Sequence, residues 1–311
     1  MGQLVDGVWI PGDVATSNNK GAYIRTERTF RDSVSFDNPI FQPESGRYHL
    51  YVSLACPWAH RTLIYLHLKN LGEHVPVSIV HPEMLESGWS FSKEFSGSTG
   101  DCLYGLDYLY QLYLQADHKI SSSVTVPVLW DSKTRTIVNN ESSEIIRMFN
   151  TAFNDLTGER SNFYPVSFRE EIDSWNKLIY KGVNNGVYKA GFAKSQQAYD
   201  EAIVTLFDVL DQIDLHLASK QFLVGDQLTE ADFRLVPTLI RFDIVYHGHF
   251  KCNVCKISEY KNISRYLREI FSLNAVKRTT NYEHITRHYH FSHDTINPYR
   301  LVPRRPRSLI I

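Results

Sequence analysis

The segment that leads into Cys56 constrains the fold of this chain most. Side chains alternate in character through residues 47–54, and a period of two residues predicts a strand. The strand runs into Cys56, and Pro57 fits the first turn of a helix. A helical apolar stripe follows, and residues 75–80 predict a second strand. The sequence therefore predicts a β-α-β unit over residues 47–80, with a cysteine at the turn from strand to helix.

Further strands and a helix complete this first domain. Residues 124–130 and 135–138 predict two strands, and a helix then runs through Phe149. Residues 81–122 form a long insertion with one helical stretch. The order β-α-β followed by β-β-α is that of a thioredoxin-like α/β domain, which we place at residues 47–150.

The regions on either side of this domain have different patterns. Residues 1–46 are polar with little periodicity, and we interpret them as an N-terminal extension that wraps or trails. After residue 150 strand signals fade, and residues 166–190 and 195–219 carry helical periodicity. We therefore expect an all-helical domain with a C-terminal tail over residues 151–311.

One helix start in this second domain has a local mechanism. Thr229 is a good N-cap residue, and Asp232, three residues later, can reach back to the cap. Leu228 and Phe233 can close a hydrophobic staple around it. We therefore predict that a helix begins at this point.

The position of Cys56 predicts a reactive thiol. At a helix N-terminus the exposed N–H groups and the helix dipole favour the thiolate, and such pKa values fall to roughly 3.5–7.5. The residue three positions on is Ala59, so the motif has no second cysteine for an internal disulfide. A monothiol of this kind needs an external thiol to resolve its mixed disulfide. The alternative, a buried structural cysteine, fits this position less well.

The composition excludes several classes of partner. The formal net charge is −1, so no overall field draws the chain to nucleic acid or to an anionic membrane. No apolar run approaches the roughly 18 residues of a membrane span, and the N-terminus has neither the basic nor the apolar region of a secretory signal. Four cysteines in 311 residues indicate free thiols in a reducing compartment. We therefore expect a cytoplasmic protein that binds neither nucleic acid nor membrane.

Two further segments suggest a site for a peptide-like ligand. In a thioredoxin-like domain, a proline that starts the third strand is typically cis and presents the preceding backbone, here Val126 before Pro127, to an extended ligand. Glu141 and Ser142 lie at a predicted helix start, where free N–H groups bind a carboxylate and Glu141 can pair with an ammonium group. A γ-glutamyl group has both charges. Plain helix capping explains the same pair equally well.

Two other sets of residues are less specific. A phenol can donate a proton or hydrogen-bond a thiolate, but with 18 tyrosines the residues alone do not select Tyr188, Tyr246 or Tyr289. A second set has the residue types of a metal site and consists of His247, His249, Cys252 and Cys255. Structural zinc sites usually space their ligand pairs further apart, so we favour unconnected residues and expect no metal.

Together these segments resemble the glutathionyl-hydroquinone reductases, the Xi class of glutathione transferases. The active-site segment at residues 47–62 reads Arg-Tyr-His-Leu-Tyr-Val-Ser-Leu-Ala-Cys-Pro-Trp-Ala-His-Arg-Thr. The resemblance covers roughly residues 1–300 in the same order. Its other segments are Gly88-Trp89 and residues 124–130, 140–142, 184–192, 241–243 and 295–298.

The resemblance implies a fold, a reaction and a set of site residues. The fold is that of a glutathione transferase, a thioredoxin-like domain plus an all-helical domain, assembled as a homodimer. Cys56 is the implied nucleophile that takes glutathione from a glutathionyl-hydroquinone, Tyr188 supplies a proton, and a second glutathione, the co-substrate, resolves the mixed disulfide. Tyr246 and Tyr289 match positions that hydrogen-bond the cysteine. The implied glutathione contacts are Trp89, Val124, Thr125, Val126, Glu141 and Ser142.

One departure and three alternatives accompany this resemblance. Family members often carry Arg where Ser123 stands, which puts the affinity for glutathione in doubt but not the reaction. A conjugating transferase needs Ser or Tyr to activate glutathione, and the cysteine at the turn argues against it. A non-catalytic glutathione-binding scaffold is the second alternative. An omega-type deglutathionylase or dehydroascorbate reductase, which shares the monothiol, is the third.

Overall fold

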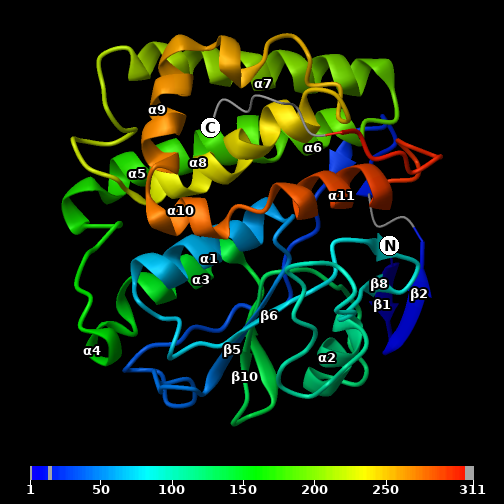
Figure 1. Cartoon of the computed structure of the whole chain (residues 1–311), viewed down its shortest axis with the longest axis vertical. Helices are drawn as coiled ribbons and strands as arrows, with labels where there is room; N and C mark the ends of the chain where they lie inside the picture. The colour runs from blue at the N-terminus through cyan, green and yellow to red at the C-terminus, as the bar shows by residue number, and fades with distance from the viewer. Residues whose placement is uncertain (1, 13–15, 305–311) are drawn as a thin grey trace. The chain divides into compact units, whose positions relative to one another are not determined.

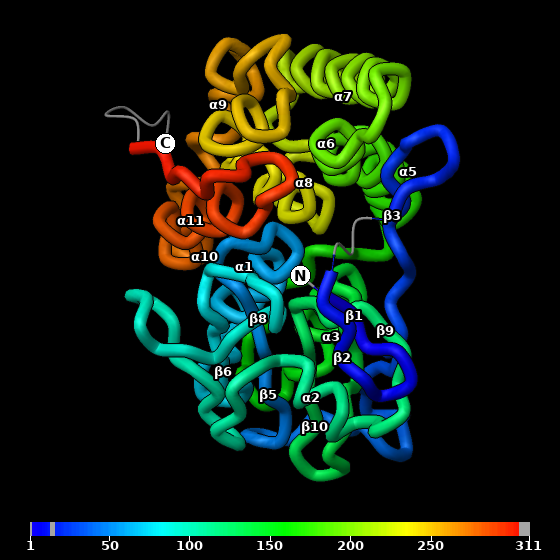
Figure 2. Tube along the Cα trace, turned by 90° about the vertical axis from the view of Figure 1, so that its right-hand side faces the viewer, coloured from blue at the N-terminus to red at the C-terminus, as the bar shows by residue number. Residues whose placement is uncertain are grey.

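The structure is a computed structural model that describes residues 2–12 and 16–304 (Figures 1 and 2). The chain forms two compact units, and the segments that make up one unit alternate along the sequence with those of the other. Within the described residues, the first unit contains residues 2–12, 26–161 and 279–292, and the second contains 16–25, 162–278 and 293–304.

A mixed four-stranded sheet in the order β11-β10-β5-β6 forms the centre of the first unit. β5 pairs in parallel with β6 and antiparallel with β10, and β10 pairs antiparallel with β11. Helices α1 and α3 pack against each other on one side of this sheet (Figure 1). The elements are β5 (Tyr48–Val52), α1 (Pro57–Leu68), β6 (Val77–Ile79), β10 (Val128–Asp131), β11 (Thr136–Asn139) and α3 (Ser142–Thr151). This order confirms the predicted thioredoxin-like arrangement.

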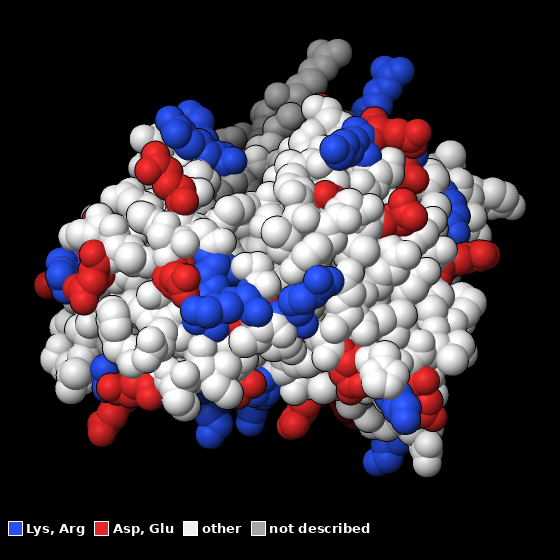
Figure 3. All heavy atoms as spheres, turned by 90° about the horizontal axis from the view of Figure 1, so that it is seen from below, with Lys and Arg blue, Asp and Glu red and all other residues white. Residues whose placement is uncertain are grey.

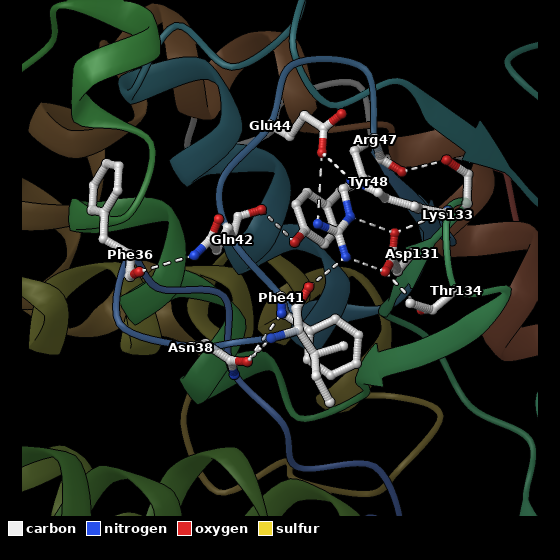
Figure 4. A network of polar contacts seen from close by, with 12 residues as sticks. Phe36, Asn38, Phe41, Gln42, Glu44, Arg47, Tyr48, Asp131, Lys133 and Thr134 are labelled. Carbon is white, nitrogen blue, oxygen red and sulfur yellow. Dashed lines mark hydrogen bonds and ion pairs between the residues drawn. The ribbon is translucent and has the colours of Figure 1, made fainter.

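A buried ion pair fixes the beginning of the strand that leads to Cys56. The Arg47 guanidinium donates to both carboxylate oxygens of Asp131, at 2.8 and 2.6 Å (Figure 4). Burial raises the pKa of Asp131, but the bonds from Arg47 and Thr134 outweigh burial, so the pKa lies below its ordinary value. Because Arg47 precedes β5 and Asp131 ends β10, the pair fastens the two central strands together.

The N-terminal extension contains strands that its sequence pattern does not reveal. β1 (Gly2–Val5) and β2 (Val8–Pro11) form a hairpin, and β1 also pairs with β9 (Ser122–Ser123) at the end of the insertion (Figure 2). The extension therefore wraps around the first unit. We did not predict these strands, because residues 1–46 are polar and show little periodicity.

The extension also contributes to the second unit. β3 (Thr16–Ser17) and β4 (Tyr23–Ile24) form a second short hairpin, and β4 contacts α6. The insertion, in contrast, stays in the first unit. It contains one helix, as predicted, at α2 (Leu109–Ala116), and in addition an unpredicted hairpin of β7 (Met84–Leu85) and β8 (Gly88–Trp89).

The second unit consists mainly of helices, as the fading strand signals predict. Its larger helices are α5 (Arg169–Ile179), α6 (Gly186–Gly191), α7 (Gln196–Leu217), α8 (Glu230–Arg241) and α9 (Lys261–Phe271). Two π-helical turns, Tyr180–Asn184 and Phe242–Tyr246, interrupt or extend them. The shorter elements of the chain are α4 (Asn154–Thr157), the 3-10 turns Val166–Phe168 and Ile257–Glu259, and α10 (Asn274–Thr279). Helix α11 (Tyr282–Ser292) returns to the first unit.

The predicted capping box at the start of α8 is confirmed. Thr229 is the N-cap residue, and its backbone N–H and hydroxyl both donate to Asp232, at 2.8 and 3.0 Å. Asp232 is fully buried and also accepts hydrogen bonds from the Leu223 N–H and the Tyr266 hydroxyl. The box therefore anchors three segments of the second unit as well as one helix end.

The surface charges are mixed in sign, and the described helices lack the length or the hydropathy that a membrane span needs. Figure 3 shows lysines and arginines interspersed with aspartates and glutamates on the face it presents. In the part of the chain that the structure describes, no helix is both long and apolar enough to cross a membrane.

Candidate functional site

Cys56 is the N-cap residue of α1, as predicted. Its backbone is extended, with φ −77° and ψ 123°, and its carbonyl accepts from the N–H of His60 at 3.0 Å. The first turn of α1 carries no acidic side chain to offset the positive end of the helix. This position favours the thiolate over the thiol.

The segment before β10 approaches the sulfur of Cys56. The Sγ atom lies 3.7 Å from the carbonyl oxygen of Val126, and the peptide bond between Val126 and Pro127 is cis, as the fold context predicts. The neighbouring residue, Thr125, turns both its backbone groups toward the hydroxyl of Tyr113. The structure therefore brings Cys56 and Val126 together, while the main chain of Thr125 bonds within the protein.

Glu141 and Ser142 lie at the start of α3, as predicted. The Glu141 carboxylate caps the helix by accepting from the N–H and the hydroxyl of Ser143, at 3.0 and 2.9 Å. Burial raises the pKa of Glu141, but these two bonds and the positive charges of Arg28 and Arg61 outweigh burial, so the pKa lies below its ordinary value. The side chain is therefore a carboxylate at neutral pH. The structure therefore shows the capping role of Glu141 directly.

Arg61 is a buried cation that the sequence did not single out. Its guanidinium lies 4.6 Å from the centre of the Trp58 ring and 3.5 Å from the hydroxyl of Ser142. The side chain is 2% exposed although it carries a full charge. Arg61 lies five residues after Cys56, so α1 and its N-cap residue supply both a thiol and a cation to this part of the unit.

Trp89 and Tyr289 belong to the same unit as Cys56. The Trp89 ring on β8 stacks on that of His288, with centroids 4.8 Å apart and planes at 21°. A ring nitrogen of His288 lies 2.8 Å from the carbonyl oxygen of Pro82, which fastens α11 to the insertion. Tyr289 follows His288 on α11 and is 1% exposed. The insertion therefore positions the indole that the resemblance assigns to glutathione.

Tyr188 and Tyr246 lie close together in the second unit. Their ring centroids are 6.1 Å apart, and the ring of Phe250 packs on both, at 5.6 and 5.5 Å. Gly191 permits this packing, because a Cβ atom there would stand 2.3 Å from the Phe250 ring. The two tyrosines therefore share one aromatic cluster.

Each of these two tyrosines lies in or shortly after a π-helical turn. Tyr246 ends one π turn, and Tyr188 follows the other by four residues. A π turn inserts a residue into a helix and rotates the side chains that follow, and such turns are frequent at functional sites. Periodicity does not report them, because one extra residue shifts the apolar pattern only slightly.

Arg25 is the site residue that the sequence analysis missed in the second unit. Its guanidinium lies 4.8 Å from the centre of the Tyr188 ring, and its Nε donates to the Asn185 side chain at 2.6 Å. Arg25 comes from the N-terminal extension, which has no pattern that points to α6. The sequence therefore carried no signal for this contact.

The predicted site residues divide between the units. The first unit holds Cys56, Tyr289 and the six predicted glutathione contacts, and the second holds Tyr188 and Tyr246. Within the first unit, direct contacts join Cys56 to Val126 and Glu141 to Ser142.

His249 lies 3.2 Å from a ring nitrogen of His293, and Cys252 is fully buried. Burial raises the pKa of the Cys252 thiol and raises that of Cys255 to about 11. Among residues 2–12 and 16–304, no group of three or more His, Cys, Asp or Glu side chains is arranged to hold a metal ion.

Two family models match this chain. Residues 55–152 match the glutathione S-transferase N-terminal domain, and residues 196–269 match the glutathione S-transferase C-terminal domain. The first match begins immediately before Cys56 and includes α3, and the second covers α7 and α8 and most of α9.

Curated relatives match almost the whole length. The glutathionyl-hydroquinone reductase YqjG of Escherichia coli K12 is 50% identical over 98% of this chain and 95% of its own. The glutathionyl-hydroquinone reductase PcpF of Sphingobium chlorophenolicum is 47% identical over 98% of this chain and 96% of its own.

Solved structures agree with these relatives. The glutathione-bound structure of YqjG from Escherichia coli has a TM-score of 0.91 and 49% identity, over 99% of this chain and 97% of that one. A Xi class glutathione transferase from Natrialba magadii has a TM-score of 0.93 and 45% identity, over 100% and 95%.

Proposed function

This chain belongs to the glutathionyl-hydroquinone reductases, the Xi class of glutathione transferases, and we propose that Cys56 is the nucleophile with which it reduces glutathionyl-hydroquinones. One observation carries the proposal. A lone cysteine caps the N-terminus of α1, beside the carbonyl of Val126 and without a second cysteine three positions on. Glutathione is the co-substrate, because a monothiol must be resolved by a thiol from outside the protein.

The first step transfers the glutathionyl sulfur to the enzyme. The Cys56 thiolate attacks the sulfur that joins glutathione to the quinol ring, so that an S–S bond forms and the bond from sulfur to the ring carbon breaks. The electron pair of the broken bond goes to the ring carbon, which takes a proton from the hydroxyl of Tyr188. The products are a free hydroquinone and a mixed disulfide of Cys56 with glutathione.

The second step regenerates the enzyme. The thiolate of a second glutathione attacks the glutathione sulfur of the mixed disulfide, and the Cys56 thiolate departs. Oxidised glutathione leaves, and a proton from solvent restores Tyr188. The N-terminus of α1 assists because it stabilises the departing thiolate as well as the attacking one.

The remaining predicted residues bind glutathione or support the thiolate. Trp89, the Val124–Val126 segment and the Glu141–Ser142 pair bind the peptide, with the Glu141 carboxylate opposite the α-ammonium of the γ-glutamyl group. The lowered pKa of Glu141 supports this role, because the group must be charged when glutathione binds. Tyr246 and Tyr289 match positions that hydrogen-bond the cysteine in the resembling family, and we propose the same role for them here.

We also infer a cytoplasmic location and a homodimer. All four cysteines are free, which fits a reducing compartment that supplies glutathione. Sedimentation of the purified protein tests the dimer, and a molecular mass twice the 36.0 kDa of one chain is the expected result.

The proposal is tested by following both products at once. Purified protein is mixed with glutathionyl-menadiol and excess glutathione, with a Cys56→Ala variant beside it. We expect menadiol and oxidised glutathione in equal amounts from the wild type, and none from the variant. Turnover that survives in the variant, or none in the wild type, contradicts the proposal.

Further assays separate the alternatives. A conjugating transferase modifies chlorodinitrobenzene with glutathione even when Cys56 is replaced by Ser. A deglutathionylase of the omega type prefers glutathionylated peptides or dehydroascorbate to the quinol adduct. A non-catalytic scaffold binds glutathione but has a Cys56 pKa near the ordinary value of about 8.5.

A further inference from the structure

The hydroxyl of Tyr113 connects two segments of the first unit. Tyr113 lies on α2 and is fully buried. Its hydroxyl donates to the carbonyl of Thr125 at 2.9 Å and accepts from the N–H of the same residue at 3.2 Å. It also accepts from the side-chain amide of Asn140 at 3.1 Å. One donor and two acceptor positions are thus all used.

One partner of this hydroxyl, Thr125, is a proposed glutathione contact, and the other, Asn140, adjoins one. Thr125 precedes Val126, whose carbonyl lies beside the Cys56 sulfur. Asn140 precedes Glu141, the carboxylate that caps α3. A single side chain therefore holds together two segments that are both proposed to bind the peptide.

The network continues into the N-terminal extension. The Asn140 side chain accepts from the N–H of Phe30 at 3.3 Å, and the Asn140 N–H donates to the Phe30 carbonyl at 3.2 Å. The Phe30 ring packs edge-on against the Tyr113 ring, with centroids 5.9 Å apart. Phe30 and Tyr113 therefore hold Asn140 from two sides. Because Tyr113 also bonds to Thr125, the network fixes the position of Thr125 relative to Asn140.

We propose that Tyr113 is a positioning residue for glutathione binding, which sets the Val124–Val126 backbone relative to Glu141. The inference rests on the proposed function, since it assigns the same two segments to the peptide. Tyr113 does not itself touch glutathione, because its hydroxyl is fully bonded inside the protein. Its loss leaves the half-buried backbone groups of Thr125 and the buried Asn140 amide without this partner, and a segment in that state shifts to find new ones.

The test measures glutathione binding without the reaction. Glutathione is titrated calorimetrically into the Cys56→Ala protein and into the same protein with Tyr113→Phe added. The phenylalanine keeps the ring packing against Phe30 and removes only the hydroxyl. We expect the dissociation constant for glutathione to rise about tenfold. An unchanged dissociation constant overturns the inference.

Tyr48 offers a matched control in the same unit. It is also fully buried, its hydroxyl donates to the backbone carbonyl of Gln42 at 2.6 Å, and its ring packs edge-on against Phe153 at 5.8 Å. Tyr48→Phe therefore loses a comparable bond away from the proposed contacts. An equal loss of glutathione affinity in this variant means that general destabilisation is responsible, and it also overturns the inference.

Kinetics of the otherwise wild-type enzyme give a second readout. In Tyr113→Phe we expect the KM for glutathione to rise while kcat at saturating glutathione and the rate of Cys56 alkylation by iodoacetamide stay within about twofold. A fall in kcat with an unchanged KM contradicts a positioning role. Asn140→Ala, which removes one of the three bonds, is expected to raise the KM less. Weaker binding in Tyr113→Phe together with no turnover by the wild type leaves this inference standing and refutes the proposed function alone.

Discussion

At the scale of single residues, the hydroxyl of Tyr188 allows the two proposed chemical roles to be tested separately. Tyr188→Phe removes the proposed proton donor but leaves Cys56 and α1 unchanged. We expect hydroquinone release to slow by about a hundredfold or more, the range that one general acid contributes. The alkylation rate of Cys56 by iodoacetamide is expected to stay nearly the same. Stopped-flow detection of menadiol measures the rate of hydroquinone release, and mass spectrometry measures the rate of Cys56 alkylation.

Tyr260 provides the control for this prediction, because its hydroxyl donates to Asp211 at 2.7 Å in the same unit. Tyr260→Phe is expected to release hydroquinone at the wild-type rate. If Tyr188→Phe slows release and alkylation equally, Tyr188 supports the structure instead of donating a proton.

Gly191 carries the second prediction at this scale. A methyl group there would stand 2.3 Å from the Phe250 ring, which packs on both Tyr188 and Tyr246. Gly191→Ala is therefore expected to lower the free energy of unfolding by about 1–3 kcal/mol, as overpacking does, and to reduce kcat. Gly186→Ala on the same helix meets Leu206 at an ordinary 3.4 Å and is expected to do neither. Equal urea midpoints for the two variants would contradict this.

Positions that follow from a local rule were the ones that the sequence predicted best. Cys56, Thr229 and Asp232 were found because each has a local rule, a helix N-terminus or a capping box, that involves only its neighbours in the chain. Arg25 and Tyr113 were missed because their partners are more than ten residues away, and no spacing in the sequence records such a contact.

At the scale of elements, the pair of central strands depends on Arg47 and Asp131. Their side chains are 5% and 0% exposed. Asp131→Asn leaves the buried guanidinium of Arg47 with only the exposed Glu44, 3.6 Å away, as a counter-charge, so we expect the free energy of unfolding at pH 7 to fall by about 3–5 kcal/mol. Lys133→Met breaks an exposed ion pair with Glu44 and is expected to cost no more than about 1 kcal/mol. Urea unfolding measures both.

The same pair gives a pH dependence with a defined sign. Because the pKa of folded Asp131 lies below its ordinary value of 3.8, the pair stabilises the fold fully above that value. The stabilisation is lost as the pH falls through the lower folded value. The difference in stability between the wild type and Asp131→Asn is therefore expected to be constant near neutral pH and to shrink in acid. A difference that grows below pH 4 would contradict the assignment.

The strands of the central sheet and the helices beside it were predicted from the sequence, whereas the hairpins of the extension and of the insertion and the two π turns were not. β5, α1 and α3 each span at least five residues, which is enough for a period to appear. The hairpins of the N-terminal extension and of the insertion have strands of two to four residues, and tertiary pairing such as that of β1 with β9 holds them. The two π turns were missed because they alter a helix by a single residue.

At the scale of the whole molecule, the N-terminal extension serves both units. β1 pairs with β9 in the first unit, and Arg25 lies over Tyr188 in the second. A protein that begins at residue 26 is therefore expected to unfold at a lower temperature and to release hydroquinone more slowly. Arg25→Gln in the full chain is expected to slow hydroquinone release to a similar extent but to lower the unfolding temperature much less. Calorimetry and the menadiol assay compare the two, and full activity of the shortened protein contradicts this role.

The interleaving of the two units has a consequence for how the protein is made. The first unit is complete only when residues 279–292 have been added, although Cys56 is synthesised within the first fifth of the chain. At about 5–20 residues per second, the ribosome needs roughly ten seconds to a minute to add the residues in between. Throughout that time the Cys56 thiol is present in a nascent chain that lacks α11. Before release, its protection from oxidation therefore depends on the cell's thiol pool instead of on the finished fold.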